Sequence, residues 1–159
     1  MSARPYIFVD SNVLIEALFE PRHPAGATIS LALAKQVRLV TCNQVIEDVE
    51  LEIIDRCEET GDLGLIDTWH EFIQSLKIKI EPDATETEAN NTYRQYIGVM
   101  RHKADIPILA VAIRLRLSVI LSGNREHFND AVSERCGIKI LSCKEFFSQL
   151  IRQELNLTV

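Results

Sequence analysis

Five polar side chains that could bind a cation lie directly after predicted strands or in the first turns of predicted helices. They are Asp10, Glu47, Asp48, Asp105 and Asn124. Carboxylate and amide oxygens are the hard ligands that Mg²⁺ and Mn²⁺ prefer, and a cation held by a few of them can activate a water and neutralise a phosphodiester. If these side chains meet in space, they favour metal-dependent hydrolysis of a phosphodiester bond.

Helix capping is the alternative explanation for three of these residues. Asp10, Asp105 and Asn124 each precede a helical run, and Asp and Asn are preferred at the N-cap of a helix. Glu47 and Asp48 lie inside a helical run and cap nothing. Several carboxylates that converge without a cation repel one another, so the joint placement favours a metal site over separate caps.

The stretch 104–128 shows how the chain could bring such residues together. Asp105 begins a helix predicted over 105–116, and residues 117–121 are a short apolar run typical of a buried parallel strand. Asn124 follows that strand. In a wound α/β sheet the helix N-termini and the strand C-termini share one edge, where ligand sites lie, so Asp105 and Asn124 should meet there.

Hydrophobic periodicity predicts the remaining elements, which alternate between strands and helices and indicate an α/β fold with a wound parallel sheet. The run of alternating charged and apolar residues near position 78 indicates a strand at or near an edge of the sheet. The predicted strands cover 6–9, 38–41, 77–80 and 137–141, and the predicted helices cover 13–18, 25–35, 45–54, 63–76, 83–103 and 144–155.

Size and composition fit one globular domain over residues 1–159, with 47% hydrophobic and 25% charged residues. The absence of a long apolar run predicts a soluble, cytoplasmic protein. The formal charge of −6 argues against a protein that binds nucleic acid through bulk positive charge, so any such contact must be local. Four cysteines without a CxxC pair are expected to be reduced.

Basic residues flank the two later acidic or amide positions and could contact phosphate at the rim of a site. The alternative is that they form solvated helix ends. These residues are Arg101, His102, Lys103, Arg125 and His127.

Four segments and the C-terminal region together resemble the PIN-domain family, the PilT N-terminus-like nucleases that include the VapC-type toxin ribonucleases. The segments are FVDSNVLIEAL, TCNQVIEDVELEI, KADIPILAVAI and VILSGNREHF, followed by IKILSCKEFFSQL. The resemblance covers nearly the whole chain. It implies a three-layer α/β/α sandwich with a central parallel sheet of four to five strands, and cleavage of RNA that depends on Mg²⁺ or Mn²⁺.

The resemblance also implies roles for the acidic residues. The first acid of the family matches Asp10 and the third matches Asp105. The second matches Asp48 by register or Glu47 by residue type, and register favours Asp48 slightly. The metal ligands implied are therefore Asp10, Asp48 and Asp105.

The fourth acidic position of the family is occupied here by Asn124, where an aspartate is more usual. An asparagine can hold a metal-bound water but supplies less charge, which weakens metal affinity or activity. Asn12, two residues after the first acid, with Lys103 and Arg125, is expected to contact substrate.

The function expected is a metal-dependent endoribonuclease and, if it is a toxin, an antitoxin protein should cover its site. The resemblance further implies a homodimer. The alternative is a catalytically weak PIN-fold module that binds RNA or protein without cutting. A third reading, a small-molecule α/β domain at the same sheet edge, is disfavoured because Gly123 stands alone and no glycine-rich loop is present.

Overall fold

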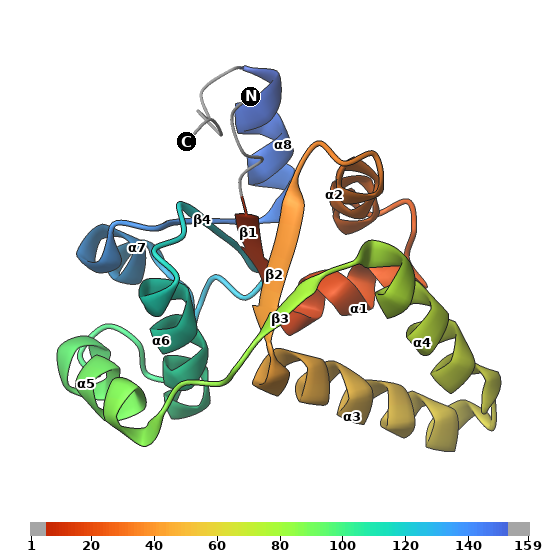
Figure 1. Cartoon of the computed structure of the whole chain (residues 1–159), viewed down its shortest axis with the longest axis horizontal. Helices are drawn as coiled ribbons and strands as arrows, with labels where there is room; N and C mark the ends of the chain where they lie inside the picture. The colour runs from red at the N-terminus through yellow and green to blue at the C-terminus, as the bar shows by residue number, and fades with distance from the viewer. Residues whose placement is uncertain (1–5, 153–159) are drawn as a thin grey trace.

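The computed structural model describes residues 6–152 and contains a parallel five-stranded sheet (Figure 1). The strand order is β3-β2-β1-β4-β5, so β1 and β4 lie in the interior of the sheet and β3 lies at an edge. The predicted parallel sheet and the edge position of the third strand are thus confirmed. The strands are β1 (Tyr6–Val9), β2 (Arg38–Cys42), β3 (Lys79–Glu81), β4 (Val119–Leu121) and β5 (Lys139–Leu141).

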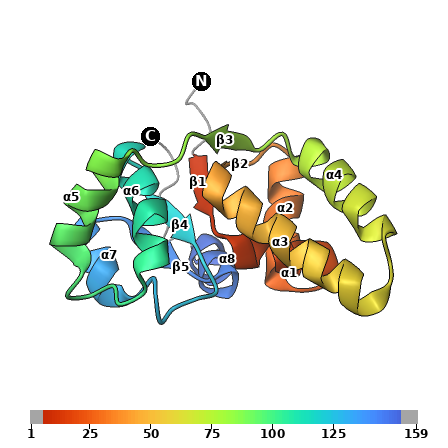
Figure 2. The ribbon, with the colours of Figure 1, turned by 90° about the horizontal axis from the view of Figure 1, so that it is seen from below.

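Helices cover both faces of the sheet and complete the three-layer α/β/α arrangement (Figures 1 and 2). Helices α5, α6 and α7 lie on one side, α1 to α4 lie on the other, and α8 packs against α2 and β5. Among the described residues, no helix combines the length and the apolar character needed to cross a membrane. The helices are α1 (Ser11–Phe19), α2 (Pro24–Leu33), α3 (Asn43–Thr60), α4 (Gly64–Leu76), α5 (Glu86–Tyr96), α6 (Ile106–Arg114), α7 (Asp130–Cys136) and α8 (Cys143–Ile151), with a 3-10 turn η1 (Lys103–Asp105) before α6.

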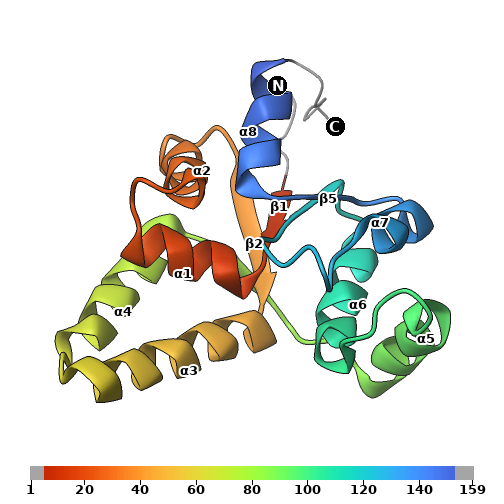
Figure 3. The same cartoon turned by 180° about the vertical axis from the view of Figure 1, so that it is seen from behind.

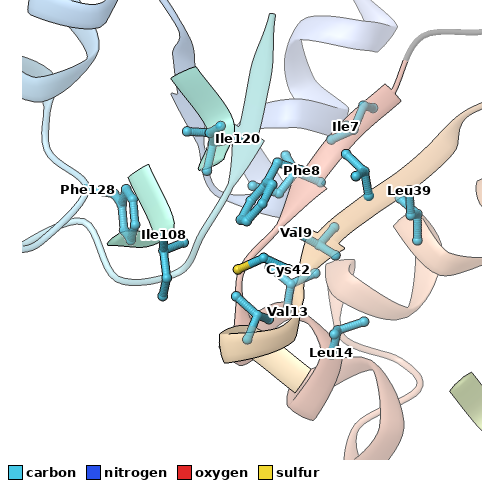
Figure 4. Close-up of a cluster of buried hydrophobic side chains, with 14 of the residues drawn as sticks. Ile7, Phe8, Val9, Val13, Leu14, Leu39, Cys42, Ile108, Ile120 and Phe128 are labelled. Carbon is cyan, nitrogen blue, oxygen red and sulfur yellow. The ribbon is translucent and has the colours of Figure 1, made fainter. Parts of the chain in front are cut away.

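The core lies on both faces of the central strands. Phe8 of β1 and Ile120 of β4 are paired in the sheet and fully buried. Figure 4 shows Ile108 and Phe128 on one side of these strands and Val13 of α1 on the other. Burying a large apolar side chain contributes about 1.5–3 kcal/mol, so packing on both faces anchors β1 and β4 inside the sheet.

The topology makes the carboxyl ends of β1 and β4 a switch point of the sheet. The chain leaves β1 through α1 and α2, which cover one face, and enters β4 from α5 and α6, which cover the other. Neighbouring strands whose connections go to opposite faces form the switch point at which wound sheets bind ligands. Figure 3 shows from behind that α1 and α3 lie on the same face of the sheet.

Two of the predicted helices differ from the observed ones. The segment 83–103 is not one helix, because α5 ends at Tyr96 and a turn follows before η1. The segment 144–155 corresponds to α8, which starts at Cys143 and ends at Ile151; residues 153–155 of that prediction lie outside the described residues.

Helix α7 was not predicted at all. It has seven residues, of which only Val132 is buried, so its sequence carries almost no apolar periodicity. Its start is nevertheless well defined, because the Asn129 side chain accepts a hydrogen bond of 3.0 Å from the Val132 N–H.

Candidate metal centre

Asp10 lies at the carboxyl end of β1 and is almost fully buried, with 5% of its surface exposed. One carboxylate oxygen accepts the N–H of Ser11 at 2.8 Å, which caps α1, and the other accepts the Ser122 hydroxyl at 2.8 Å. Burial raises the pKa of Asp10, these two donors oppose that rise, and the negative charges of Asp105 and Asp48 add to it. Asp10 is therefore both a helix cap and a member of a carboxylate cluster.

Ser122 and Asn12 join the ends of β1 and β4. The Asn12 amide nitrogen lies 3.4 Å from both Asp10 Oδ2 and Ser122 Oγ, and its oxygen accepts the Gly123 N–H at 2.8 Å. Ser122 Oγ also accepts the Asn124 N–H at 3.1 Å. Sequence reasoning missed the role of Ser122; the available signal was a polar residue directly after a buried strand.

Asp48 lies in the second turn of α3 and interacts electrostatically with Asp10 and Asp105. Partial desolvation raises the pKa of Asp48, and the charges of Asp105, Glu47 and Asp83 raise it further. Asp48 also acts on the pKa of Asp10. The charge of Asp48, and not that of Glu47, is among the causes that raise the pKa of Asp10, which favours Asp48 as the second acid, as the register of the sequence motif does.

Asp105 does not cap α6, so the capping explanation is wrong for this residue. It ends the 3-10 turn η1 with a helical backbone (φ −87°, ψ −14°), whereas a capping residue is extended. Its Oδ2 atom is buried and forms no hydrogen bond within residues 6–152, although the Nδ1 atom of His127 lies 2.5 Å away. The carboxylate therefore contacts His127, which follows β4, and makes no capping hydrogen bond to its own helix.

Gln44 holds the start of α3 against the segment that leads to Asp105. Its backbone N–H donates to Asp83 Oδ1 at 2.7 Å, and its side-chain amide donates to the Ala104 carbonyl at 2.8 Å. These contacts connect the elements that carry Asp48 and Asp105. No pattern in the sequence indicates this pairing, because the bonded residues are far apart in the chain.

Asn124 lies beside the carboxylate cluster but does not cap a helix, so capping is also wrong here. A turn follows it, closed by a hydrogen bond of 3.0 Å from the Phe128 N–H to its carbonyl, and Asn129 caps α7 instead. The side-chain amide of Asn124 lies 2.8 Å from Nδ1 of His127. Of the three residues for which capping was the alternative, only Asp10 caps a helix.

A family model described as the PIN domain matches residues 7–133. This chain belongs to the PIN-domain family. The match includes Asp10, Asp48, Asp105 and Asn124, which carried the resemblance in the sequence.

Solved structures with the same fold agree with this assignment. PAE2754 from Pyrobaculum aerophilum is 14% identical with a TM-score of 0.63, and the alignment covers 94% of this PIN domain chain and 91% of that chain. FitAcB from Neisseria gonorrhoeae is 16% identical with a TM-score of 0.60, covering 87% and 98%. The structure of VapBC2 from Rickettsia felis bound to a promoter DNA fragment is 11% identical with a TM-score of 0.60, and the alignment covers 86% of this chain and 98% of that chain. At these identities the likeness establishes the fold, and a search of curated proteins finds no match.

The residues of this PIN domain that face one another fit a divalent cation. Asp10, Asp48 and Asp105 come from three separate elements, and their charges act on one another at a partly desolvated place. The buried Oδ2 atom of Asp105 meets no regular hydrogen bond among the described residues and is contacted by the ring nitrogens of His127 and His102. Hard oxygen donors of this kind suit Mg²⁺ or Mn²⁺.

A groove of about 910 Å³ borders the cluster and is lined by Arg101, His102, Arg125 and His127 among others. Arg125 is largely engaged within the protein, because it donates to the Ile140 carbonyl and to Asp130 at 2.6 Å. Lys103 is exposed, with Nζ 5.8 Å from the centre of the Tyr93 ring. Four of the five basic residues predicted for the rim therefore line the groove, Arg125 among them although it also bonds within the fold, and Lys103 is not one of the lining residues.

Proposed function

We propose that the chain is a Mg²⁺- or Mn²⁺-dependent endoribonuclease that hydrolyses RNA phosphodiester bonds. Asp10, Asp48 and Asp105 would hold the cation, and Asn124 would help to orient the attacking water. The single observation that carries this proposal is the convergence of the three carboxylates at the switch point of the sheet, where the charges of Asp48 and Asp105 add to the effect of burial on the pKa of Asp10. Such an arrangement costs folding stability unless a cation offsets the repulsion.

The protein side chains have separable tasks in this proposal. When bound, the cation would supply positive charge that stabilises the negative charge developing on the phosphodiester. Asp10 is held in one orientation by the Ser11 N–H and the Ser122 hydroxyl, so one of its ligand positions is fixed before any cation binds. The groove that His102 and His127 line beside Asp105 carries Arg101, and Lys103 is exposed next to His102 in the chain. Both could contact the RNA backbone locally, which fits a protein whose net charge gives no general attraction to nucleic acid.

RNA cleavage by the purified protein tests this function. The natural chain and the Asp10→Asn and Asp105→Asn variants are incubated with a pool of structured RNAs in Mn²⁺, Mg²⁺ or EDTA. We expect cleavage that EDTA abolishes and that falls at least about a hundredfold in both variants, because each loses a charged ligand. Cleavage that survives both substitutions would contradict the proposed site.

A second candidate function is an RNA- or protein-binding module with little catalytic activity. It is favoured by one observation, the amide of Asn124 at the fourth acidic position, where its side chain lies against His127. Replacing Asn124 with Asp restores the usual charge. A large gain in metal-dependent cleavage in Asn124→Asp would favour the binding module as the natural role, whereas unchanged or lower cleavage would favour the nuclease.

We also propose a protein partner, an antitoxin if the chain is a toxin, and self-association into a homodimer. Large apolar side chains on α3 and around the start of α4 are exposed and could contact such a partner: Leu51, Ile54, Leu63 and Ile66. One of the similar structures, VapC20 from Mycobacterium tuberculosis, is a sarcin-ricin loop cleaving toxin; it is 14% identical with a TM-score of 0.53, covering 74% of this chain and 91% of that one. A single domain over residues 1–159 that acts in the cytoplasm completes the proposal.

A further inference from the structure

Two histidines meet the carboxylate of Asp105 on the side that faces the groove. Nδ1 of His127 lies 2.5 Å from Asp105 Oδ2, and Nδ1 of His102 lies 3.3 Å from the same oxygen. The two imidazole rings are stacked, with centroids 4.2 Å apart and planes 9° from parallel. One ligand atom from each of the three residues falls within 4.8 Å of the others, which is the spacing of a metal-binding group.

The close contacts in this cluster compete for the same atoms. Oδ2 of Asp105 is buried, and both ring nitrogens contact it; each contact is an ion pair only when that ring is protonated. Nδ1 of His127 also lies 2.8 Å from the side-chain nitrogen of Asn124, so an amide donor and a carboxylate compete for one ring nitrogen. Amide oxygen and nitrogen positions are interchangeable in such a network, and a rotated Asn124 would add an oxygen to the cluster.

We propose that His102, Asp105 and His127 form a binding site for a transition-metal cation of the Zn²⁺ type. Neutral imidazole and carboxylate are the ligands that Zn²⁺ takes in proteins, while Mg²⁺ selects oxygen atoms. A cation bound by both ring nitrogens and Oδ2 would replace these nitrogen–oxygen contacts, and the 2.5 Å contact of His127 would open to about 3 Å, the separation that two ligands of one tetrahedral Zn²⁺ require. Asp105 is held by the short turn η1, whereas His102 is exposed enough to rotate into position.

This site is distinct from the acidic centre, although both use Asp105. Its imidazole ligands lie on the groove side of Asp105, while Asp10 and Asp48 approach from β1 and α3. The proposal does not rest on nuclease activity, since it concerns binding alone. If the site exists, this PIN domain offers imidazole ligands for Zn²⁺ next to Asn124, the residue at the family's fourth acidic position.

The test is calorimetric titration of the full chain, freed of metal with EDTA, with Zn²⁺ and separately with Mg²⁺. The variants are His102→Gln and His127→Gln, with His70→Gln as the matched control because His70 is an exposed histidine on α4. His102 is exposed, so its replacement should leave the fold intact, and circular dichroism checks this. An Asp10→Asn variant is titrated in parallel.

We expect Zn²⁺ affinity to fall at least about tenfold in His102→Gln and in His127→Gln. Replacing a residue that only hydrogen-bonds to a metal ligand already lowers metal affinity by about tenfold or more, and these variants would lose a ligand itself. His70→Gln should bind Zn²⁺ like the natural chain, and Mg²⁺ affinity should not follow the histidines. Zn²⁺ affinity unchanged in both cluster variants, or reduced equally by His70→Gln, would overturn the site. Asp10→Asn separates the two proposals, because it should remove RNA cleavage while Zn²⁺ binding continues to depend on His102 and His127.

Discussion

The Asp10 carboxylate is buried, yet it is supported in its charged form by two hydrogen-bond donors. The Ser122 hydroxyl and the Ser11 N–H both lie 2.8 Å from it, and both lower its pKa against the rise that burial causes. The charged form is the one that binds a cation. Ser122 therefore contributes to the acidic centre without touching a substrate, by keeping Asp10 oriented and easier to ionise.

Replacing Ser122 with Ala should move the acid limb of metal-dependent cleavage to higher pH. The substitution removes a donor to the charged carboxylate, so the pKa of Asp10 rises further and more alkaline solution is needed to ionise it. The lost hydrogen bond should also lower the free energy of unfolding by about 1 kcal/mol. The pH profile of cleavage is compared with that of Ser11→Ala, which keeps the backbone N–H; identical acid limbs in the two variants would contradict this role.

At the residue scale the sequence placed Asp10 after a strand and Asp105 before a helix, and the structure has both residues at those positions. The sequence favoured Asp48 over Glu47 as the second acid only slightly. Adjacent residues of a helix point their side chains in different directions, and which direction leads to the sheet edge depends on how the helix packs. The sequence also could not predict that His102 and His127 stack beside Asp105. That contact depends on how two loops from different elements meet, and no local periodicity encodes it.

At the scale of elements, the junction between α1 and α2 is constrained by one close approach. A Cβ atom built on Gly26 would lie 2.2 Å from the carbonyl oxygen of Pro21, which belongs to the turn that reverses the chain. Backbone atoms cannot move away as a flexible side chain does. Only glycine therefore fits where α2 folds back after α1.

The Gly26→Ala substitution should destabilise the fold by about 1–3 kcal/mol or more, as expected for overpacking against a rigid neighbour. Gly98→Ala is the matched control, because a Cβ there meets nothing within 4 Å. Urea unfolding of both variants measures the difference. Equal unfolding midpoints for the two would show that the turn at Pro21 adapts, which is the result that this packing argument does not allow.

Elements with a strong apolar signal were predicted, and elements without one were not. The residues of β1 and β4 are buried on both faces and form continuous apolar runs, so their sequences are distinctive. Helix α7 has one buried residue in seven, and the predicted helix 83–103 merged α5 with the turn that follows it. Helix lengths at polar stretches depend on tertiary contacts that a single sequence does not display.

At the scale of the whole molecule, the parallel α/β architecture follows from the alternation of apolar runs and helical patterns, and the sheet then brings distant acids together. Because the formal net charge is −6, the protein as a whole does not attract a polyanion such as RNA. A bound cation would offset the local negative charge near the carboxyl ends of β1 and β4, where the charges of three partly desolvated carboxylates act on one another. The central claim is therefore that these three carboxylates form one cation site.

Calorimetric titration with Mg²⁺ tests this claim most directly, because Mg²⁺ selects oxygen ligands and does not report on the histidines. The metal-free natural chain is compared with Asp10→Asn, Asp48→Asn and Asp105→Asn, and Glu47→Gln serves as the control on the adjacent position of α3. We predict one site whose affinity falls at least about tenfold in each of the three aspartate variants and changes much less in Glu47→Gln. Mg²⁺ binding that Asp48→Asn leaves unchanged, or that Glu47→Gln abolishes, would contradict the site described.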